Sequence, residues 1–436
     1  MTANLEKAKD LFLEGLDHFG AGRLADAEDR FVSSLALVPG RVSTLINLGA
    51  TRVRLDKAQE ALDPLTQVLA LEPDNVDAWF HRGAALGALA RHDEALVCFD
   101  NIVSIDSLHA AGWYQRGRTL SLLRRPADAL QSFEKFLAFE PEHGDAWFRH
   151  GKLLQVLDRH DEALSSYGKA VGFDPTLAQA WSNRGALLKD MQQLEEAALC
   201  FRNAIAHGAD AELNEYFLAA ALGQRGPATA PKRYVEPLFD GYADRYDEHM
   251  VKVLKYQAHA VLGAGLAGKH FGLALDLGCG TGLCGPLLKP LVDRLDGVDL
   301  SANMIEKART LGTYARLTQM DMAEYLRTAE PRYDLIVAAD VFIYIGDLMP
   351  VFSGAQRALN ENGAFCFSVE IADDDRDFEL LPSSRYAHSP RYIRELAGRY
   401  GFDLTNTLAH PIREDQRQPI LGLFVYLTKT SPRAHR

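Results

Sequence analysis

All four tryptophans of this 436-residue chain recur at intervals of 34 residues, and a glycine and an alanine keep the same period. The recurring residues are Trp79, Trp113, Trp147 and Trp181; Gly49, Gly83, Gly117, Gly151 and Gly185; and Ala27, Ala61, Ala95, Ala129, Ala163 and Ala197. This period predicts helical hairpins, because the small residues let two helices approach while aromatic residues fill the space between them. One hairpin cannot bury its apolar face alone, so the hairpins must stack into a superhelix with a concave face.

Aromatic residues and prolines continue the period. They are Phe31, Phe99, Phe133, Tyr167 and Phe201, with Pro39, Pro73, Pro141 and Pro175 closing most units. The complete pattern resembles the tetratricopeptide repeat. The resemblance implies six repeats over about 8–211 and a capping helix near 212–223. It also implies an all-α superhelix that binds a peptide, a protein or a protein-carried small molecule in its groove.

Three aromatic residues directly follow a tryptophan, and arginines lie near them. These candidate substrate-binding residues are Phe80, Tyr114, Phe148, Arg116, Arg149 and Arg184. Such positions often face the concave side in the resembling family, so we expect an aromatic and cationic inner surface that suits a carboxylate-bearing ligand. The alternative is that the arginines are solvated on an ordinary helix face.

The helical period ends at the sequence GQRGPATAPKR (223–233), which indicates a boundary between domains at 1–225 and 226–436. Beyond it, short apolar runs alternate with amphipathic segments. The pattern predicts strands over 272–277, 294–298, 315–320, 333–338 and 364–370, and helices over 282–290, 302–311, 322–328 and 347–359. This order predicts an α/β domain with a parallel sheet, whose binding crevice lies at the carboxyl ends of the strands.

The sequence LALDLGCGTGLCGP (273–286) contains two overlapping glycine spacings. One of them, Gly280-x-Gly282-x-x-Gly285, is that of a dinucleotide-binding turn and leaves a nicotinamide-dependent reductase as an alternative. However, Asp276 places a carboxylate beside the loop, where a pyrophosphate would bring like charge to like charge. The next two strands end on Asp299 and Asp321, which can accept hydrogen bonds from a ribose diol and an adenine amino group. An adenosyl ligand that carries positive charge, such as S-adenosylmethionine, fits this set better.

Three stretches extend this comparison: DLGCGTG (276–282), GVDLSANMIEKA (297–308) and AADVFIYIGDL (338–348). They resemble the class I S-adenosylmethionine-dependent methyltransferases, and in particular bacterial members with N-terminal tetratricopeptide repeats. The resemblance covers about 234–430 and implies a Rossmann-like domain that uses S-adenosyl-L-methionine. By position it implies cofactor contacts from Asp276, Gly278, Cys279, Gly280, Thr281, Gly282, Asp299, Leu300, Met304, Asp321, Met322 and Asp340. It also places Tyr242 and Tyr246 in a lid over the cofactor, the alternative being that they pack a helix onto the sheet.

Methyl transfer is an in-line displacement in which the protein mainly positions the acceptor and excludes water. A base helps where the acceptor is a hydroxyl or a protonated amine. Candidates are Tyr344 after the fourth strand, Glu370 at the end of the fifth, and His388 in the polar sequence SSRYAHSPRYI. His388 can instead be a helix-entry or surface group. The acceptor stays open, and the alternative function is a scaffold that binds adenosylmethionine without turnover.

The formal net charge of −12 is spread along the chain, which argues against nucleic acid or an anionic membrane surface as the main partner. No apolar run approaches the length of a membrane span, so we expect a cytoplasmic protein. The five cysteines include no CxxC pair, and we expect neither a disulfide framework nor a metal site.

Overall fold

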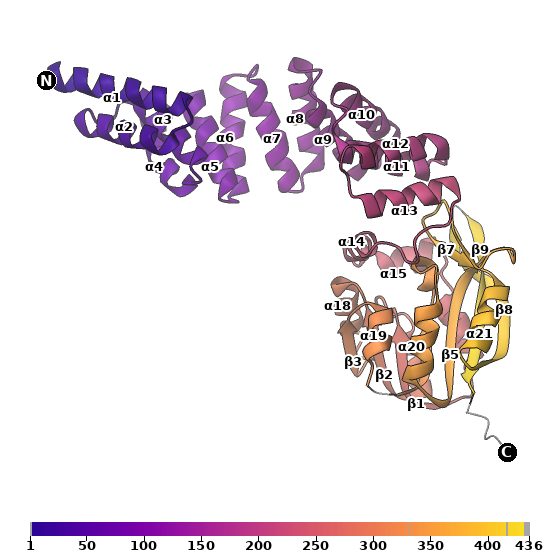
Figure 1. The fold of residues 1–436 in the computed structure, drawn as a ribbon. Coiled ribbons are helices and arrows are strands. Elements are labelled where there is room, and N and C mark those ends of the chain that lie inside the picture. Colours follow the sequence, from indigo (N-terminus) through magenta and orange to yellow (C-terminus); the bar gives the residue numbers. More distant parts are fainter. Residues whose placement is uncertain (1, 331, 416, 431–436) are drawn as a thin grey trace. The chain divides into compact units, whose positions relative to one another are not determined.

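The computed structural model describes residues 2–330, 332–415 and 417–430 (Figure 1). By its internal contacts the chain divides into two compact units, Met1–Arg184 and Gly185–Arg436. This division falls inside the sixth repeat, whereas the boundary expected at 225/226 separates repeat sequence from sheet sequence. No helix in the described ranges is both long and apolar enough to cross a bilayer.

The first half of the chain is helical, as its period predicts. Its helices are α1 (Thr2–Gly20), α2 (Leu24–Leu37), α3 (Val42–Arg54), α4 (Ala58–Leu71), α5 (Val76–Ala88), α6 (His92–Ile105), α7 (Ala110–Leu122), α8 (Pro126–Phe139), α9 (Gly144–Val156), α10 (His160–Phe173), α11 (Ala178–Asp190), α12 (Leu194–Ala206) and α13 (Ala211–Leu222). Consecutive helices pair as hairpins from α1 with α2 onward. Close approach within a hairpin requires glycine, since a Cβ on Gly117 would lie 2.9 Å from the ring of Phe133.

The periodic tryptophans also tie each repeat to the turn before it. The indole nitrogen of Trp79 donates to the carbonyl of Pro73 at 2.7 Å, and that of Trp147 donates to the carbonyl of Pro141 at 2.8 Å. Besides packing, each of these tryptophans therefore satisfies its indole N–H on the backbone of the preceding turn.

The second half alternates strands and helices. Its helices are α14 (Lys232–Tyr242), α15 (Tyr246–Glu248), the π-helical turn η1 (His249–Val253), α16 (Ala258–Gly265), α17 (Gly285–Leu288), the 3₁₀ turns η2 (Lys289–Leu291) and η3 (Phe342–Tyr344), α18 (Ala302–Thr310), α19 (Met322–Thr328), α20 (Met349–Ala358) and α21 (Pro390–Arg399). Its strands are β1 (Phe271–Leu277), β2 (Val292–Asp299), β3 (Arg316–Gln319), β4 (Tyr333–Ala338), β5 (Leu359–Ile371), β6 (Phe378–Leu380), β7 (Tyr386–His388), β8 (Phe402–Asp415) and β9 (Gln418–Lys429).

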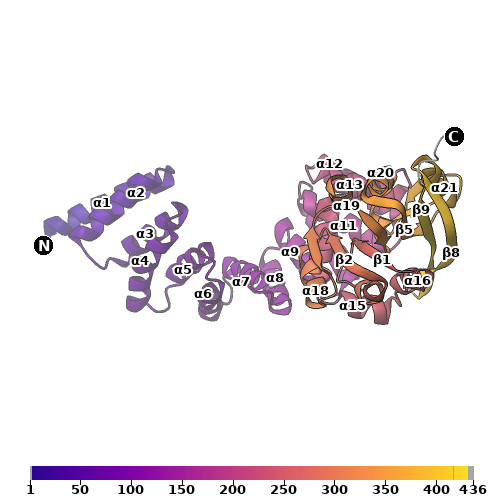
Figure 2. The same ribbon diagram turned by 90° about the horizontal axis from the view of Figure 1, so that it is seen from below.

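Strands β3, β2, β1, β4 and β5 lie side by side in that order and run parallel, which confirms the predicted α/β arrangement. Beyond them β9 pairs antiparallel with β5, and β8 pairs antiparallel with β9, at the yellow end of the sheet in Figure 2. The short hairpin of β6 and β7 joins through β7, which runs parallel to the end of β5. The parallel strands bring their carboxyl ends to one edge, where the ligand crevice of such a sheet lies.

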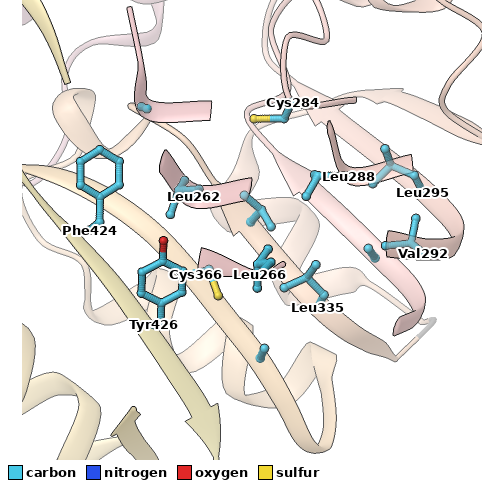
Figure 3. Packing of buried hydrophobic residues seen from close by; sticks show 14 of the residues in the cluster. Leu262, Leu266, Cys284, Leu288, Val292, Leu295, Leu335, Cys366, Phe424 and Tyr426 are labelled. Carbon is cyan, nitrogen blue, oxygen red and sulfur yellow. The ribbon is translucent and has the colours of Figure 1, made fainter. Parts of the chain in front are cut away.

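One apolar cluster holds α16 and α17 against the sheet (Figure 3). Leu262 of α16 and Leu266, which directly follows this helix, pack in one cluster with Leu335 of β4 and Tyr426 of β9. The phenol of Tyr426 is satisfied by the carbonyl of Val261 at 3.0 Å. This packing covers one face of the sheet and fixes the strand ends from which the candidate site is built.

Helices α12 and α13 belong to the same compact unit as the sheet. Tyr216 of α13 is fully buried, and its hydroxyl donates to the carbonyl of Ser384 at 2.5 Å. The ring of Phe217 meets that of Tyr234 on α14 at 5.2 Å, and Lys189 donates to the carbonyl of Pro382 at 3.2 Å. Within this unit, α13 therefore packs directly on α14 and on the segment between β6 and β7.

Candidate active site

A cavity of about 310 Å³ opens at the carboxyl ends of β1, β2, β3 and β4. Many residues expected at the cofactor or substrate line it together. They are Tyr246, Gly278, Gly280, Asp299, Leu300, Met304, Asp321, Met322, Asp340 and Tyr344. Residues from four strand ends and from the segment before β1 thus converge on one space.

The glycine loop after β1 needs residues without a side chain. Gly278 has φ +72°, and a Cβ there would lie 2.5 Å from Val341, so a larger residue would meet both strain and a clash. The loop is held by Asp299 at the end of β2: one carboxylate oxygen accepts from the amide of Gly280 at 2.8 Å and the other from the amide of Ser301 at 2.9 Å. Each oxygen keeps a lone pair for a further donor, so Asp299 can also accept from a diol.

Asp276 lies behind the loop and is absent from the lining of the cavity. It is almost fully buried, and it accepts a hydrogen bond from the hydroxyl of Tyr314 at 2.6 Å. Burial raises the pKa of the Asp276 carboxyl to about 7, against the opposing effect of that hydrogen bond. Asp276 thus holds the hydroxyl of Tyr314, whose ring lies beside Gly282 and Gly285.

Three further residues of the motif also stand outside the lining. Thr281 donates to Asp247 of α15, and Cys279 is a buried thiol whose pKa burial raises. A Cβ on Gly282 would lie 2.8 Å from Leu311, so this glycine allows close packing against α18. These positions shape the loop and connect it to the segment before β1.

The segment over 232–253 closes one side of the cavity. Val235 and Phe239 of α14 and Tyr246 of α15 line the space, whereas Tyr242 turns its hydroxyl to His249. The segment is tied to the end of β2, because Asp240 accepts from the hydroxyl of Ser301 at 2.5 Å. Of the two tyrosines expected in a lid, Tyr246 lines the cavity and Tyr242 does not.

The boundary sequence contributes to the site as well. Thr229 forms a bridge with Ile345, and the amide of Ala230 donates to the carbonyl of Tyr344 at 2.9 Å. Lys232 lines the cavity, and its ammonium lies 3.4 Å from Asp321. The sequence offered no signal for this, because proline, alanine and glycine there suggested only a connection between domains.

An ion cluster lies at the edge of the cavity. The guanidinium of Arg413 on β8 donates to Asp340 at 2.6 Å and also to Glu370 on β5. All three side chains are buried: the exposed fraction is 2% for Arg413, 5% for Asp340 and 7% for Glu370. Burial raises the pKa of the Glu370 carboxyl despite the neighbouring guanidinium. Arg413 was missed by sequence reasoning, since nothing local marks an arginine as the partner of residues 43 and 73 positions earlier.

The structure separates the three candidate bases. Tyr344 lines the cavity, and burial raises the pKa of its phenol. Glu370 is engaged by Arg413 and is absent from the lining. The expectation that His388 lies in a polar loop is wrong: it ends strand β7, is fully buried, and its Nε2 donates to the carbonyls of Ile345 at 2.9 Å and Gly346 at 3.1 Å. Burial lowers the pKa of His388 to about 4, so this imidazole is a neutral structural group.

In the repeat unit, the arginines expected in the groove have partners within the chain. Arg116 donates to Asp100 at 2.6 Å, and Arg149 donates to Asp145 at 2.7 Å. Arg184 lies 6.0 Å from the centre of the Trp181 ring. Two other cations of the same helices, Arg118 and Lys152, are exposed.

These two cations lie over the expected aromatic residues. The Arg118 guanidinium is 6.0 Å from the centre of the Tyr114 ring, and the Lys152 ammonium is 5.7 Å from that of Phe148. Together with Phe80 one repeat earlier, these residues lie on α5, α7 and α9, and we call Phe80, Tyr114, Phe148, Arg118 and Lys152 the aromatic–cationic surface. Within the described residues, no group of three or more His, Cys, Asp or Glu side chains is arranged to hold a metal ion.

Comparison with known families finds one match in each half of the chain. Residues 274–363 match the model of a methyltransferase domain, and residues 144–177 match that of a tetratricopeptide repeat. Such a domain, and the methyltransferases to which the chain is similar, imply S-adenosyl-L-methionine as the methyl donor.

Two curated relatives are O-methyltransferases. The chain is 36% identical over 135 residues to the malonyl-[acyl-carrier protein] O-methyltransferase of Geobacter sulfurreducens, covering 29% of this chain and 49% of that protein. It is 25% identical over 171 residues to the ubiquinone biosynthesis O-methyltransferase of Coxiella burnetii, covering 34% of this chain and 71% of that protein. The chain thus spans about half the length of the first of these relatives.

Solved structures similar to the chain include a MamA protein, at 20% identity and a TM-score of 0.37, covering 41% of this chain and 96% of that one. YrrB, described as a TPR protein with an unusual peptide-binding site, is 21% identical with a TM-score of 0.38, covering 41% of this chain and 92% of that one.

Proposed function

Since the chain carries tetratricopeptide repeats followed by a methyltransferase domain, we propose that it is a class I S-adenosylmethionine-dependent methyltransferase. The observation that carries the proposal is the convergence of the glycine loop, Asp299 and Asp321 on one cavity. A crevice at the carboxyl ends of parallel strands, with a carboxylate at each of two strand ends, suits an adenosyl group.

Three carboxylates of the cavity each contact a different part of the ligand in this proposal. Asp299 accepts from the ribose hydroxyls, Asp321 from the adenine amino group, and Asp340 faces the charged methionine portion. When bound, this group would supply an activated methyl on a sulfonium. The sulfur would leave readily as a neutral thioether, without acid catalysis. The protein therefore needs to align the acceptor with the methyl and to keep water out. Water is excluded by the apolar side chains of the segment over 232–253 that line the cavity, among them Val235 and Phe239.

Oxygen is the acceptor atom that we infer. Both named relatives are O-methyltransferases, and the sequence after β4 lacks the Asn/Asp-Pro-Pro-Tyr motif of enzymes that methylate amide or adenine nitrogen. Of the three candidate bases, Tyr344 alone lines the cavity, and we assign it to hydrogen-bond the acceptor. Its raised pKa keeps the phenol protonated at neutral pH, so that it donates a hydrogen bond that orients the acceptor. A carboxylate acceptor loses no proton on methylation, whereas a hydroxyl acceptor releases its proton to solvent.

The repeats act on the acceptor side, because the cavity for the cofactor is built from residues of the sheet unit. The aromatic–cationic surface suits an acidic peptide or the acidic carrier of a small acceptor, through charge-assisted contacts with Arg118 and Lys152. We expect the double variant Arg118→Ala/Lys152→Ala to raise the KM for the acceptor and to leave the Kd of the cofactor unchanged. Lys135→Ala, an exposed lysine on α8, is the matched control.

The first experiment compares ligands by thermal shift and calorimetry. S-adenosylmethionine and its demethylated product should bind, while a nicotinamide cofactor should not. Incubation of cell lysate with labelled methyl donor then separates an enzyme from a scaffold. Binding without any transferred label would support the scaffold, and no binding of either adenosyl ligand would refute the proposal.

A further inference from the structure

The ion cluster of Asp340, Arg413 and Glu370 has one guanidinium between two carboxylates. It joins three elements that are distant in sequence: the end of β4, strand β5 and strand β8. Asp340 stands in the left-handed region, with φ +56°, and its amide donates to the hydroxyl of Ser368 at 2.8 Å. Both its backbone and its side chain are therefore held in one orientation at the cavity wall.

Stability alone does not account for this cluster. Removing three charged groups from water costs several kcal/mol per ion, and apolar side chains of similar volume often stabilise a fold better. The guanidinium of Arg413 is shared by two carboxylates, so these three side chains together carry one net negative charge when both carboxylates are ionised, and Arg385 adds a positive charge near Glu370. Asp340 is the member of the cluster that lines the cavity, so the charge of the cluster acts on whatever ligand the cavity holds.

We propose that Arg413 is a positioning residue, which fixes Asp340 and Glu370 as an ionised pair and so gives the cavity wall a constant negative charge that receives a cationic ligand. The inference rests on the proposed function and deepens it. Methyl donor and demethylated product differ in charge, because the donor has a sulfonium where the product has a neutral thioether. A constant negative wall therefore favours the donor over the product.

The charged and titratable groups around the cluster come from several elements. Tyr246 of α15 and Tyr256 before α16 face it, and burial raises the pKa of both phenols, so they stay neutral. Tyr344 behaves in the same way, and Arg385, before β7, adds a positive charge near Glu370. Arg413 is thus the group that contacts both carboxylates directly.

Loss of Arg413 leaves two carboxylates close together without their shared cation. Two like charges held close together favour the uptake of one proton, which the two carboxylates then share as a coupled unit. A cationic ligand then has to displace this proton. In Arg413→Gln the affinity for S-adenosylmethionine should therefore rise with pH, relative to the native protein, by up to about tenfold per pH unit.

The test measures the Kd of S-adenosylmethionine by calorimetry between about pH 6 and 9 in buffers of different ionisation enthalpy. The expected result is an extra proton released on binding to Arg413→Gln, and rescue of the native profile by Arg413→Lys. A merely structural role would lower stability or affinity at every pH without this proton. Titration of the ligand and of Asp276 affects the native protein and the variant equally, so it cancels when the affinity of one is divided by that of the other at each pH.

A second variant keeps the inference testable if Arg413→Gln does not fold. Glu370→Gln leaves Arg413 with one carboxylate, which makes the cluster neutral. It should show no extra proton release, and its preference for S-adenosylmethionine over the demethylated product should fall. An unchanged preference in Glu370→Gln, or parallel pH profiles of the native protein and Arg413→Gln, would overturn the inference. Absence of binding to the native protein would instead refute the proposed function.

Discussion

Asp299 is the residue whose replacement tests the proposed site most directly. Its two oxygens already accept from the amides of Gly280 and Ser301, so Asp299 shapes the glycine loop before any ligand arrives. In Asp299→Asn one oxygen becomes an amide group, which is a donor. One of the two backbone amides then faces a donor, and the contact to the ribose loses its charge.

The size of the effect follows from these contacts. A hydrogen bond to a charged group contributes about 1.5–3 kcal/mol. The affinity for S-adenosylmethionine should therefore fall about ten- to hundredfold in Asp299→Asn. The matched control is Asp293→Asn on the same strand, where the carboxylate is 73% exposed and faces His270. An exposed pair of this kind contributes little, and affinity there should change by less than about twofold.

Calorimetry with the donor and with the demethylated product measures both variants. Hydrogen exchange of the loop over 278–282 without ligand separates disruption of the loop from loss of the ribose contact. If Asp299→Asn binds as tightly as the native protein, the assignment of Asp299 to the ribose is refuted. If Asp293→Asn is equally impaired, the loss reflects the general charge of the strand rather than the geometry at Asp299.

Two further predictions concern the sheet unit. A fragment over 226–436 lacks the buried Tyr216, and loss of a buried aromatic side chain costs about 3–5 kcal/mol. In a calorimetric scan this fragment should therefore melt at a lower temperature than a fragment over 178–436. Equal melting temperatures would show that α12 and α13 are dispensable. His388 has a pKa of about 4 when folded and 6.5 as an ordinary value, so its contribution is complete above pH 6.5 and is lost as pH falls through 4. In His388→Gln the free energy of unfolding should depend less on pH in this range, by up to about 3 kcal/mol. Hydrogen exchange of β7 measures this free energy at each pH. An unchanged slope would contradict the burial of a neutral imidazole.

Much of the candidate site could be predicted because its signals are local. The glycines of the loop and the acidic residues Asp299 and Asp321 follow directly on strands that the apolar pattern reveals. Parallel strands then bring these residues to one edge of the sheet without further information. Where the motif residues support the loop instead of lining the cavity, as Asp276 does, the sequence could not distinguish the two roles, since both need the same residue at the same place.

Sequence alone determined the repeated hairpins, the alternation of strands and helices, and the chemistry of the glycine loop, because period and local conformational preference are properties of neighbouring residues. Tertiary structure decided which charges meet and which polar groups are buried. Arg413 joins Asp340 and Glu370, His388 enters a buried strand, and Tyr216 of the last repeat region packs on the sheet unit. These outcomes depend on pairings between residues far apart in the chain, and the energy of a buried charge or polar group is set by whichever partner the completed fold places beside it.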